Sequence, residues 1–178
     1  MSTSGLDGDA AQRILEERAR RLARPPATVS TPHQALDLLV FRRADAVYAV
    51  DAVRVVEVLR RTRPTPLPGT RPFLPGVIHH RGRIVAVLDA HALIASGVAP
   101  AQEGQMVVVA AGPARLALVA DEIQGVRTIS VDEMTTAGGL AARAPAVWVR
   151  GTAPGMATVL GVEDLVRDAR LNIDEAGA

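Results

Sequence analysis

The hydrophobic and polar positions in residues 76–94 predict a β-hairpin followed by a helical turn. Val77–Ile78 is a short apolar run, Arg81–Arg83 is a polar break around a glycine, and Ile84–Leu88 is a continuous apolar run. Two β-rich runs around such a break are typical of a hairpin, here with a turn longer than the minimum. Because the second run does not alternate with polar residues, we expect both faces of that strand to be covered.

The segments on either side of this hairpin predict where it ends. Asp89 stops the second apolar run, and its carboxylate can cap a helical turn at Ala90–Ile94 by accepting hydrogen bonds from the first amides of that turn. Arg60–Pro75 carries five of the twelve prolines of the chain, which predicts a loop. A second loop is expected over Ser96–Gln105.

Earlier in the chain the pattern predicts another hairpin. Leu36–Phe41 is an apolar strand, Arg42–Asp45 a polar turn and Val47–Val50 the returning strand. The following Val-rich segment, Asp51–Leu59, fits both a helix and a strand, although its four β-branched residues favour extended structure.

The second half of the chain repeats this order. A strand at Met106–Ala110, a turn at Gly112–Pro113 and a strand at Leu116–Ala120 repeat the first hairpin. The matched residues are Asp51 with Asp121, Val56 with Val126, Val77 with Val147 and Ile78 with Trp148; with two extra residues in the second turn, Ile84–Leu88 matches Met156–Leu160 and Ala90–Ile94 matches Val162–Val166. We interpret this order as a duplication. Short strands joined by Gly and Pro turns, in two copies, predict an all-β fold of two small barrels with minor helices.

Residues 1–35 predict an extension with a helix of its own. A capping box of Asp9 and Gln12 begins an amphipathic helix over about residues 9–24, and Pro25–Pro26 ends it. The apolar stripe of this helix fits packing on its own domain, and docking on a partner is the alternative. A Pro-containing linker follows, so that the strand-rich domain spans residues 36–178.

Composition narrows the chemistry that the chain can perform. The sequence has no cysteine, which excludes disulfides, thiolate metal sites and a cysteine nucleophile. Hydrophobic residues make up 48% of the chain and aromatic residues 2%, so aliphatic side chains must fill the core. The first residues lack the apolar core that is typical of a signal peptide, and no apolar run reaches the roughly 18 residues that a membrane helix needs. We therefore expect a soluble cytoplasmic protein.

The ionisable residues do not form a recognisable catalytic, cofactor or metal site. His79 and His80 are neighbours in a predicted strand, so they point to opposite faces, and we expect ordinary surface or edge histidines. The carboxylate pairs Asp121–Glu122 and Asp132–Glu133 are adjacent along the chain and do not converge on one substrate. Motifs of nucleophilic and phosphate-binding enzymes are absent. The sequence predicts no enzyme, no cofactor and no metal.

Positive charge is concentrated in the first half of the chain. Residues 42–83 contain nine arginines and three acids, a formal charge of +6, whereas the whole chain carries +1. A nucleic-acid-binding barrel is one interpretation, but such barrels stack bases on aromatic side chains, and the few aromatic residues here show no interleaved pattern. A protein-binding surface explains the charge better, because rim charges steer association and set specificity.

Arg81 is the most informative single residue. It follows an apolar strand and precedes Gly82, so its side chain begins near buried surface and its guanidinium needs an acceptor. Glu57, in the Val-rich segment, is the candidate acceptor. The alternative is a surface arginine at a hairpin tip that touches nothing.

At these residues the chain resembles the CheW family of chemotaxis coupling proteins. The family stretch reads roughly Gly-Val-Ile-Asn-Leu-Arg-Gly-x-Ile-Val-Pro-Val-Ile-Asp-Leu, and residues 76–90 follow it. Tyr48–Asp51 and Leu118–Ile123 are similar to further landmarks, and the likeness spans about residues 36–167. It implies two intertwined five-stranded SH3-like barrels, with a helix near the C-terminal end and with the N-terminal helix outside the likeness.

The resemblance also implies a role. Such proteins are cytoplasmic adaptors at membrane receptor arrays, and they couple the helical tip of a chemoreceptor to the regulatory domain of a CheA-type sensor histidine kinase without catalysis. By position, the partner-binding surface implied here consists of Val55, Glu57, Gly76, His80, Arg81 and Gly82. The chain departs from the family pattern where His79–His80 replaces Asn-Leu and where Ala86 replaces a proline.

Two functional alternatives stay open from the sequence. A scaffold of this kind can serve a chemosensory pathway whose output is not motility, which genome neighbours would distinguish. A nucleic-acid-binding small β-barrel belongs to a different class and predicts salt-sensitive binding to oligonucleotides.

Overall fold

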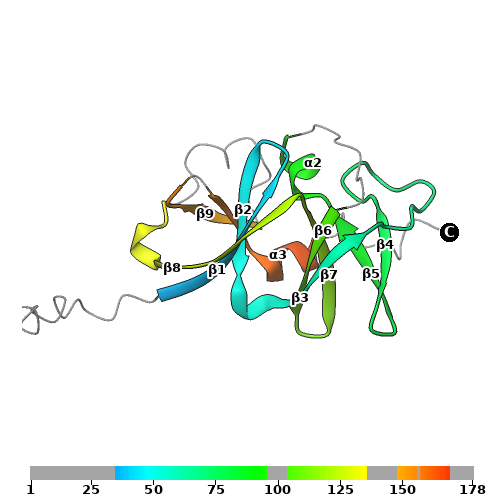
Figure 1. Ribbon diagram of the computed structural model, residues 1–178, viewed down its shortest axis with the longest axis horizontal. Helices are drawn as coiled ribbons and strands as arrows, with labels where there is room; N and C mark the ends of the chain where they lie inside the picture. The colour runs from blue at the N-terminus through cyan, green and yellow to red at the C-terminus, as the bar shows by residue number, and fades with distance from the viewer. Residues whose placement is uncertain (1–34, 96–103, 136–147, 156, 169–178) are drawn as a thin grey trace, which may run out of the picture. The chain divides into compact units, whose positions relative to one another are not determined.

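The computed structural model describes residues 35–95, 104–135, 148–155 and 157–168, all within one compact unit from Gln34 to Ala178. The expected helix over about residues 9–24 and its linker lie outside the described residues. The elements, in chain order, are β1 (Ala35–Arg43), β2 (Ala46–Asp51), the 3-10 helix η1 (Ala52–Arg54), β3 (Val55–Thr62), β4 (Gly76–His80), β5 (Arg83–Leu88), α2 (Ala90–Ala95), β6 (Gly104–Ala111), β7 (Ala114–Ala120), β8 (Glu122–Ser130), the 3-10 helix η2 (Val131–Glu133), β9 (Val149–Ala153), β10 (Ala157–Leu160) and α3 (Val162–Arg167) (Figure 1).

The strands of the described residues form two five-stranded sheets. The first sheet has the order β8-β1-β2-β10-β9, and the second has the order β3-β6-β7-β5-β4. If each of β1 to β5 is exchanged with the strand five places later, β6 to β10, one order becomes the other. This correspondence confirms the predicted duplication. Each sheet takes strands from both halves of the chain, and β2 and β7 each pair in parallel with a strand of the other half. The predicted all-β, intertwined architecture is therefore confirmed.

The pairing register corrects the residue matches within the first hairpin of each half. The turns Ala44–Asp45 and Gly112–Pro113 are equivalent, because each is a two-residue turn between the last paired residues of its hairpin. These pairs are Arg43 with Ala46 and Ala111 with Ala114. Counting from these turns, Asp51, which pairs with Leu38, is equivalent to Val119, which pairs with Met106, and not to Asp121. The predicted match is wrong by two residues because a sequence comparison aligned the acidic strand ends and not the turns.

A pair of glycines shows where the second hairpins of the two halves correspond. Gly76 of β4 and Gly151 of β9 occupy the same ladder position, so the predicted match of Ile78 with Trp148 is wrong. A Cβ atom on Gly76 would lie 2.0 Å from the carbonyl oxygen of Thr65, and one on Gly151 would meet the equivalent threonine oxygen at 2.7 Å. Both glycines therefore allow a close approach of two backbones.

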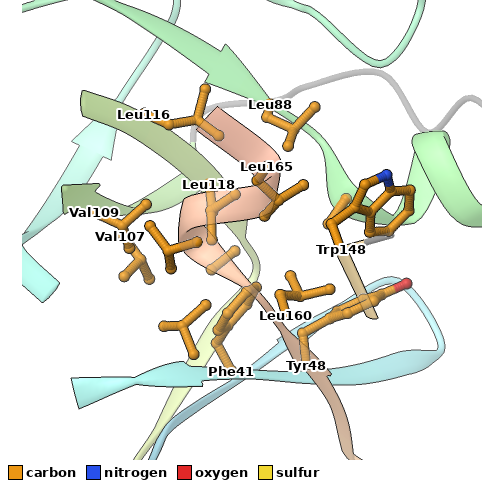
Figure 2. Close-up of a cluster of buried hydrophobic side chains, with 14 of the residues drawn as sticks. Phe41, Tyr48, Leu88, Val107, Val109, Leu116, Leu118, Trp148, Leu160 and Leu165 are labelled. Carbon is orange, nitrogen blue, oxygen red and sulfur yellow. The ribbon is translucent and has the colours of Figure 1, made fainter. Parts of the chain in front are cut away.

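The hydrophobic core has three parts. The first sheet encloses a small cluster, and the second sheet encloses another. The largest cluster lies between the sheets and receives side chains from both of them and from α3 (Figure 2). Its largest fully buried members are Trp148, Tyr48, Phe41, Leu88, Leu118, Leu160 and Leu165. Aliphatic side chains supply most of all three clusters, as the composition predicts.

The β4–β5 hairpin is confirmed, with two corrections. His80 pairs with Arg83, so the turn is the two-residue Arg81–Gly82, with φ of 47° and 77°. Positive φ at both positions matches the right-handed twist of the flanking strands, which makes a longer turn unnecessary. Ile84 is 69% exposed, because β7 pairs with β5 only from Ala86 onward and the tip projects beyond it. The expectation that both strand faces are covered is wrong at this end.

The segments before and after the β4–β5 hairpin have nearly the structure that the sequence predicts. Asp89 Oδ1 accepts hydrogen bonds from the amides of His91 and Ala92 at 3.1 and 3.2 Å, so it caps α2. The ambiguous Val-rich segment, Asp51–Leu59, is mostly extended: Asp51 ends β2, η1 takes the next three residues and β3 the rest. Because β3 continues to Thr62, the Pro-rich loop begins later than predicted.

Candidate partner-binding site

Glu57 on β3 and Arg81 at the tip of the β4–β5 hairpin form the ion pair that the sequence predicts. Arg81 Nη2 and Nε lie 2.9 and 3.1 Å from Glu57 Oε2. The pair faces solvent, with 65% of the Arg81 side chain and 36% of the Glu57 side chain exposed. The alternative of an arginine that touches nothing is wrong.

His80 joins this pair from the buried side. Its Nε2 atom lies 2.9 Å from the same Oε2 of Glu57, and its side chain is only 4% exposed. His79 is exposed, as expected for neighbours on opposite faces of a strand. His80 lies on an edge strand, β4, but the expectation of a surface histidine is wrong for it, because the second sheet curls until its two edge strands, β3 and β4, approach each other.

The neighbours of Glu57 favour its charged form. The hydrogen bond from His80 is the largest cause lowering the pKa of the Glu57 carboxyl; desolvation opposes it, and the nearby Arg81 charge adds to it. Glu57 is therefore a carboxylate at neutral pH and can only accept hydrogen bonds.

The other predicted site residues have different surroundings. Gly82 lies in the exposed turn beside Arg81, with open space around it. Val55 packs against the central core. Gly76 is buried, and its backbone abuts Thr65. The structure thus brings Glu57, His80, Arg81 and Gly82 together, whereas Val55 and Gly76 belong to the scaffold beneath them.

The stretch of chain that contains Arg81 carries positive charge. Residues 58–88 contain no aspartate or glutamate. The exposed arginines of this stretch include Arg60, Arg63, Arg71 and Arg83. A surface of this kind attracts acidic partners over a distance set by the ionic strength.

The aromatic side chains do not form a base-stacking surface. Phe41, Tyr48 and Trp148 are at most 2% exposed and belong to the central core. Phe73 is partly buried against the same cluster. The aromatic side chains of the described residues are therefore not available to stack bases in the way that single-strand binders do.

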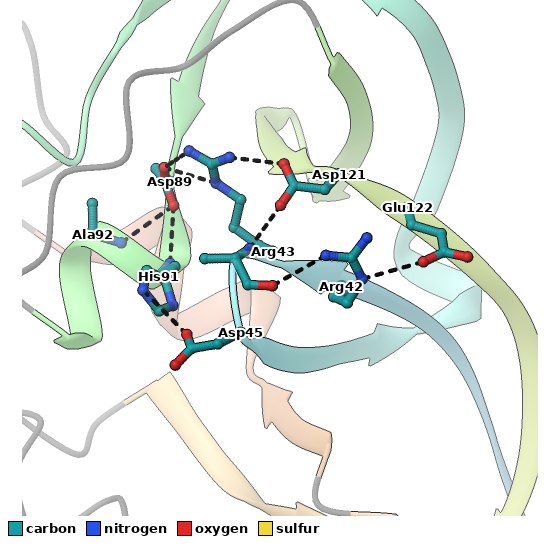
Figure 3. Close-up of polar contacts among 9 residues, drawn as sticks. Arg42, Arg43, Asp45, Asp89, His91, Ala92, Asp121 and Glu122 are labelled. Atoms are coloured by element: carbon teal, nitrogen blue, oxygen red, sulfur yellow. Dashed lines mark hydrogen bonds and ion pairs between the residues drawn. The ribbon is translucent and has the colours of Figure 1, made fainter.

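A second cluster of charges joins the two sheets (Figure 3). Arg43 donates to Asp89 Oδ2 from Nε and Nη2 at 3.0 and 2.7 Å, and to Asp121 Oδ1 from Nη1 at 2.8 Å. The side chains of Arg43 and Asp89 are 6% and 2% exposed. The Ala44 amide donates to the second oxygen of Asp121 at 2.7 Å. This cluster holds the end of β1 against the ends of β5 and β7.

Sequence reasoning missed this cluster, although Asp89 and Asp121 each directly follow a predicted apolar strand. Beside it, the Tyr48 hydroxyl lies 3.3 Å from His91 Nδ1, and His91 Nε2 lies 3.7 Å from Asp45. Burial, then the charges of Asp89 and Asp45, raise the pKa of Tyr48, so its phenol stays neutral. We assign these groups to the packing of the two sheets.

The remaining features offer little for chemistry. A pocket of about 260 Å³ lies beside β1, β8 and the β9–β10 turn, and Arg127 is the only ionisable side chain among its described lining residues. Across the part of the chain that the structure describes, no three His, Asp or Glu residues gather as metal ligands. The described helices include none with the length and apolarity to cross a membrane.

Comparison with known proteins agrees with the fold. The crystal structure of the scaffolding protein TtCheW from Thermoanaerobacter tengcongensis superposes with a TM-score of 0.60, covering 70% of this chain and 86% of that one at 22% sequence identity. At this identity the likeness shows the fold alone.

Sequence relatives extend the likeness. Protein FrzA of Myxococcus xanthus is 34% identical over 109 residues, which are 61% of this chain and 67% of FrzA. Protein PilI of Pseudomonas aeruginosa is 28% identical over 119 residues, 66% of this chain and 67% of PilI. The model of the CheW-like domain matches residues 37–170. The two interlocked sheets, the hairpin at residues 76–88 and these matches together show that the chain belongs to the CheW-like domain family.

Proposed function

We propose that this protein is a non-enzymatic adaptor that couples a chemoreceptor to a CheA-type sensor histidine kinase. Membership of the CheW-like family supports the proposal, as does the fold shared with a scaffolding protein. The adaptor binds the helical tip of the receptor and the regulatory domain of the kinase, needs no cofactor, and is a cytoplasmic protein recruited to receptor arrays.

The observation that carries the proposal is the exposed Glu57–Arg81 pair. Most solvent-exposed ion pairs are loosely held and contribute little to stability. This one stands on a turn whose first residue, Arg81, adopts a left-handed backbone that disfavours arginine. Non-glycine residues kept in such conformations cluster at functional sites. We assign the contact with the partner to Glu57, Arg81 and Gly82.

Val55 and Gly76 act beneath this contact in the proposal. Val55 anchors the start of β3 to the central core, and Gly76 lets the Pro-rich loop lie against β4. We therefore expect their substitution to weaken partner binding through the fold. His80 is treated below, because it is too buried to touch a partner directly.

Titration against a receptor signalling fragment from the native organism tests the contact. We expect Arg81→Ala and Glu57→Ala to lower affinity about tenfold or more while thermal unfolding changes little, because each removes a charged contact at the surface. Arg42→Ala is the matched control, since Arg42 forms a pair with Glu122 at 3.2 Å that is also exposed and shares no residue with the Glu57–Arg81 pair. Wild-type affinity in both test variants would contradict the assigned contact.

The output of the pathway and the nucleic-acid alternative have their own tests. A cluster of flagellar genes around the native gene favours motility, and a regulator or pilus cluster favours another output. Nucleic-acid binding by the basic surface predicts a gel shift with oligonucleotides that disappears as salt is raised. We expect no shift at low salt, because no exposed aromatic platform occurs among the described residues.

A further inference from the structure

The hydrogen bonds around His80 identify which of its nitrogens carries a proton. Nε2 lies 2.9 Å from Glu57 Oε2, and an ionised carboxylate only accepts, so Nε2 must donate. Nδ1 is buried and has no hydrogen-bond partner among the described residues. With Nε2 carrying the proton, Nδ1 is the unprotonated acceptor of the ring, and a proton placed on Nδ1 would be a buried donor without a partner among the described residues.

His80 also fixes an atom that Arg81 shares. Nε and Nη2 of Arg81 reach the same Oε2 that His80 holds. A carboxylate on an exposed strand edge has several rotamers, and holding it in one costs side-chain entropy. Because the His80 ring is buried, its position is fixed, and the hydrogen bond from its Nε2–H holds Glu57 Oε2 in one place. The guanidinium of Arg81 is then confined with it.

We propose that His80 is a positioning residue: from its buried site it donates Nε2–H to Glu57 and so holds Glu57 and Arg81 in the arrangement that the partner binds, without touching the partner itself. This inference rests on the proposed function for its effect on binding. The hydrogen bond from His80 to Glu57 can be measured without any partner.

Two amide substitutions separate the two ring nitrogens. The side-chain nitrogen of glutamine reaches about as far as Nε2, whereas that of asparagine reaches only as far as Nδ1. We expect His80→Gln to keep the donor to Glu57. His80→Asn and the apolar His80→Leu remove it, although all three variants fill the site with side chains of moderate size.

The partner-free measurement is NMR titration of the Glu57 carboxyl, with nitrogen NMR of the His80 ring in the wild-type protein. We expect protonated Nε2 and unprotonated Nδ1 in the wild-type ring. The Glu57 carboxyl should titrate as in the wild type in His80→Gln, and at higher pH in His80→Asn and His80→Leu. A proton on Nδ1 in place of Nε2, or a Glu57 titration that is unchanged in all three variants, would contradict the proposed hydrogen bond. If one variant folds poorly, the other variants and the wild-type ring still decide the question.

The binding measurement is titration with the receptor fragment. We expect His80→Gln to bind within about twofold of the wild type, and His80→Asn and His80→Leu to lose about tenfold, the value of one charged hydrogen bond. If Arg81→Ala loses affinity but all His80 variants retain it, the positioning role is wrong and the proposed contact stands. If Arg81→Ala also binds like the wild type, the proposed contact fails and the positioning role fails with it.

Discussion

At the scale of single residues, Arg43 shows how one buried cation holds the two sheets together. Its guanidinium bridges Asp89, at the end of β5, and Asp121, between β7 and β8. A buried ion pair adds little over an apolar packing, but removing one member leaves the other charge unpaired at a large cost. Asp89 has a second task, since it also caps α2.

Replacing Asp89 by Asn separates its two tasks. The amide oxygen can still cap α2, but the charge is lost and an N–H group turns toward Arg43. We expect the free energy of unfolding to fall by about 3 kcal/mol in urea denaturation. Arg42→Ala breaks an exposed pair instead, 42% and 56% exposed, and should cost less than about 1 kcal/mol. Equal losses in the two variants would contradict the role of the buried cluster.

The lowered pKa of the Asp121 carboxyl makes the free energy of unfolding depend on pH. Burial raises the pKa of its carboxyl, but the Ala44 amide and Arg43 outweigh burial and leave the pKa below its ordinary value. The folded state therefore releases this proton at lower pH than the unfolded state does. The resulting stability is present above about pH 4 and is lost as the pH falls through the folded-state pKa. Unfolding free energies between about pH 2 and 5 should depend less steeply on pH in Asp121→Asn. An unchanged slope would exclude this linkage.

At the scale of elements, the β4–β5 hairpin depends on a glycine that the sequence assigns to partner binding. Gly76 has φ of 143°, and an added Cβ would lie 2.0 Å from the Thr65 oxygen. The bridge between Thr65 and Val77 ties the Pro-rich loop to β4 at this point. Any loss of binding on substituting Gly76 would therefore arise from the scaffold.

We expect Gly76→Ala to lower the free energy of unfolding by at least about 2 kcal/mol, because it combines backbone strain with a backbone clash. Gly112→Ala is the control for strain alone, since Gly112 has φ of 61° and open space around its Cβ position. It should cost about 1 kcal/mol. Urea denaturation of both variants checks the order, and an equal cost would exclude the clash.

The elements were largely predictable, and their contacts were not. Apolar runs between Gly and Pro turns locate the hairpins because strand periodicity and turn chemistry are local properties. The partners of Arg43 lie 46 and 78 residues away, so no local pattern could identify them. The burial of His80 depends on the curl of a whole sheet. The pair Glu57–Arg81 was predicted because an arginine at a strand end needs an acceptor, and Glu57 in the Val-rich segment was the candidate acceptor.

At the scale of the whole molecule, neither half of the chain contains a complete sheet. The first sheet needs β8, β9 and β10 beside β1 and β2, and the second needs β6 and β7 beside β3, β4 and β5. The largest core also draws on both halves. The two sheets should therefore fold as one cooperative unit.

Fragments test this interlocking. We expect residues 35–95 and residues 104–168, produced separately, to lack cooperative thermal unfolding, because each exposes the apolar face that the other covers. Mixing them should restore the far-ultraviolet circular dichroism and a cooperative transition. A fragment that folds alone would contradict the interlocked arrangement.

The most direct test of the central claim is co-sedimentation of a CheA-type kinase with receptor-bearing membranes from the native organism. The account predicts that the kinase sediments with the membranes when this protein is added, and that Arg81→Ala reduces the sedimented fraction while Arg42→Ala does not. Kinase that sediments equally without the protein, or a protein that binds neither component, would contradict it.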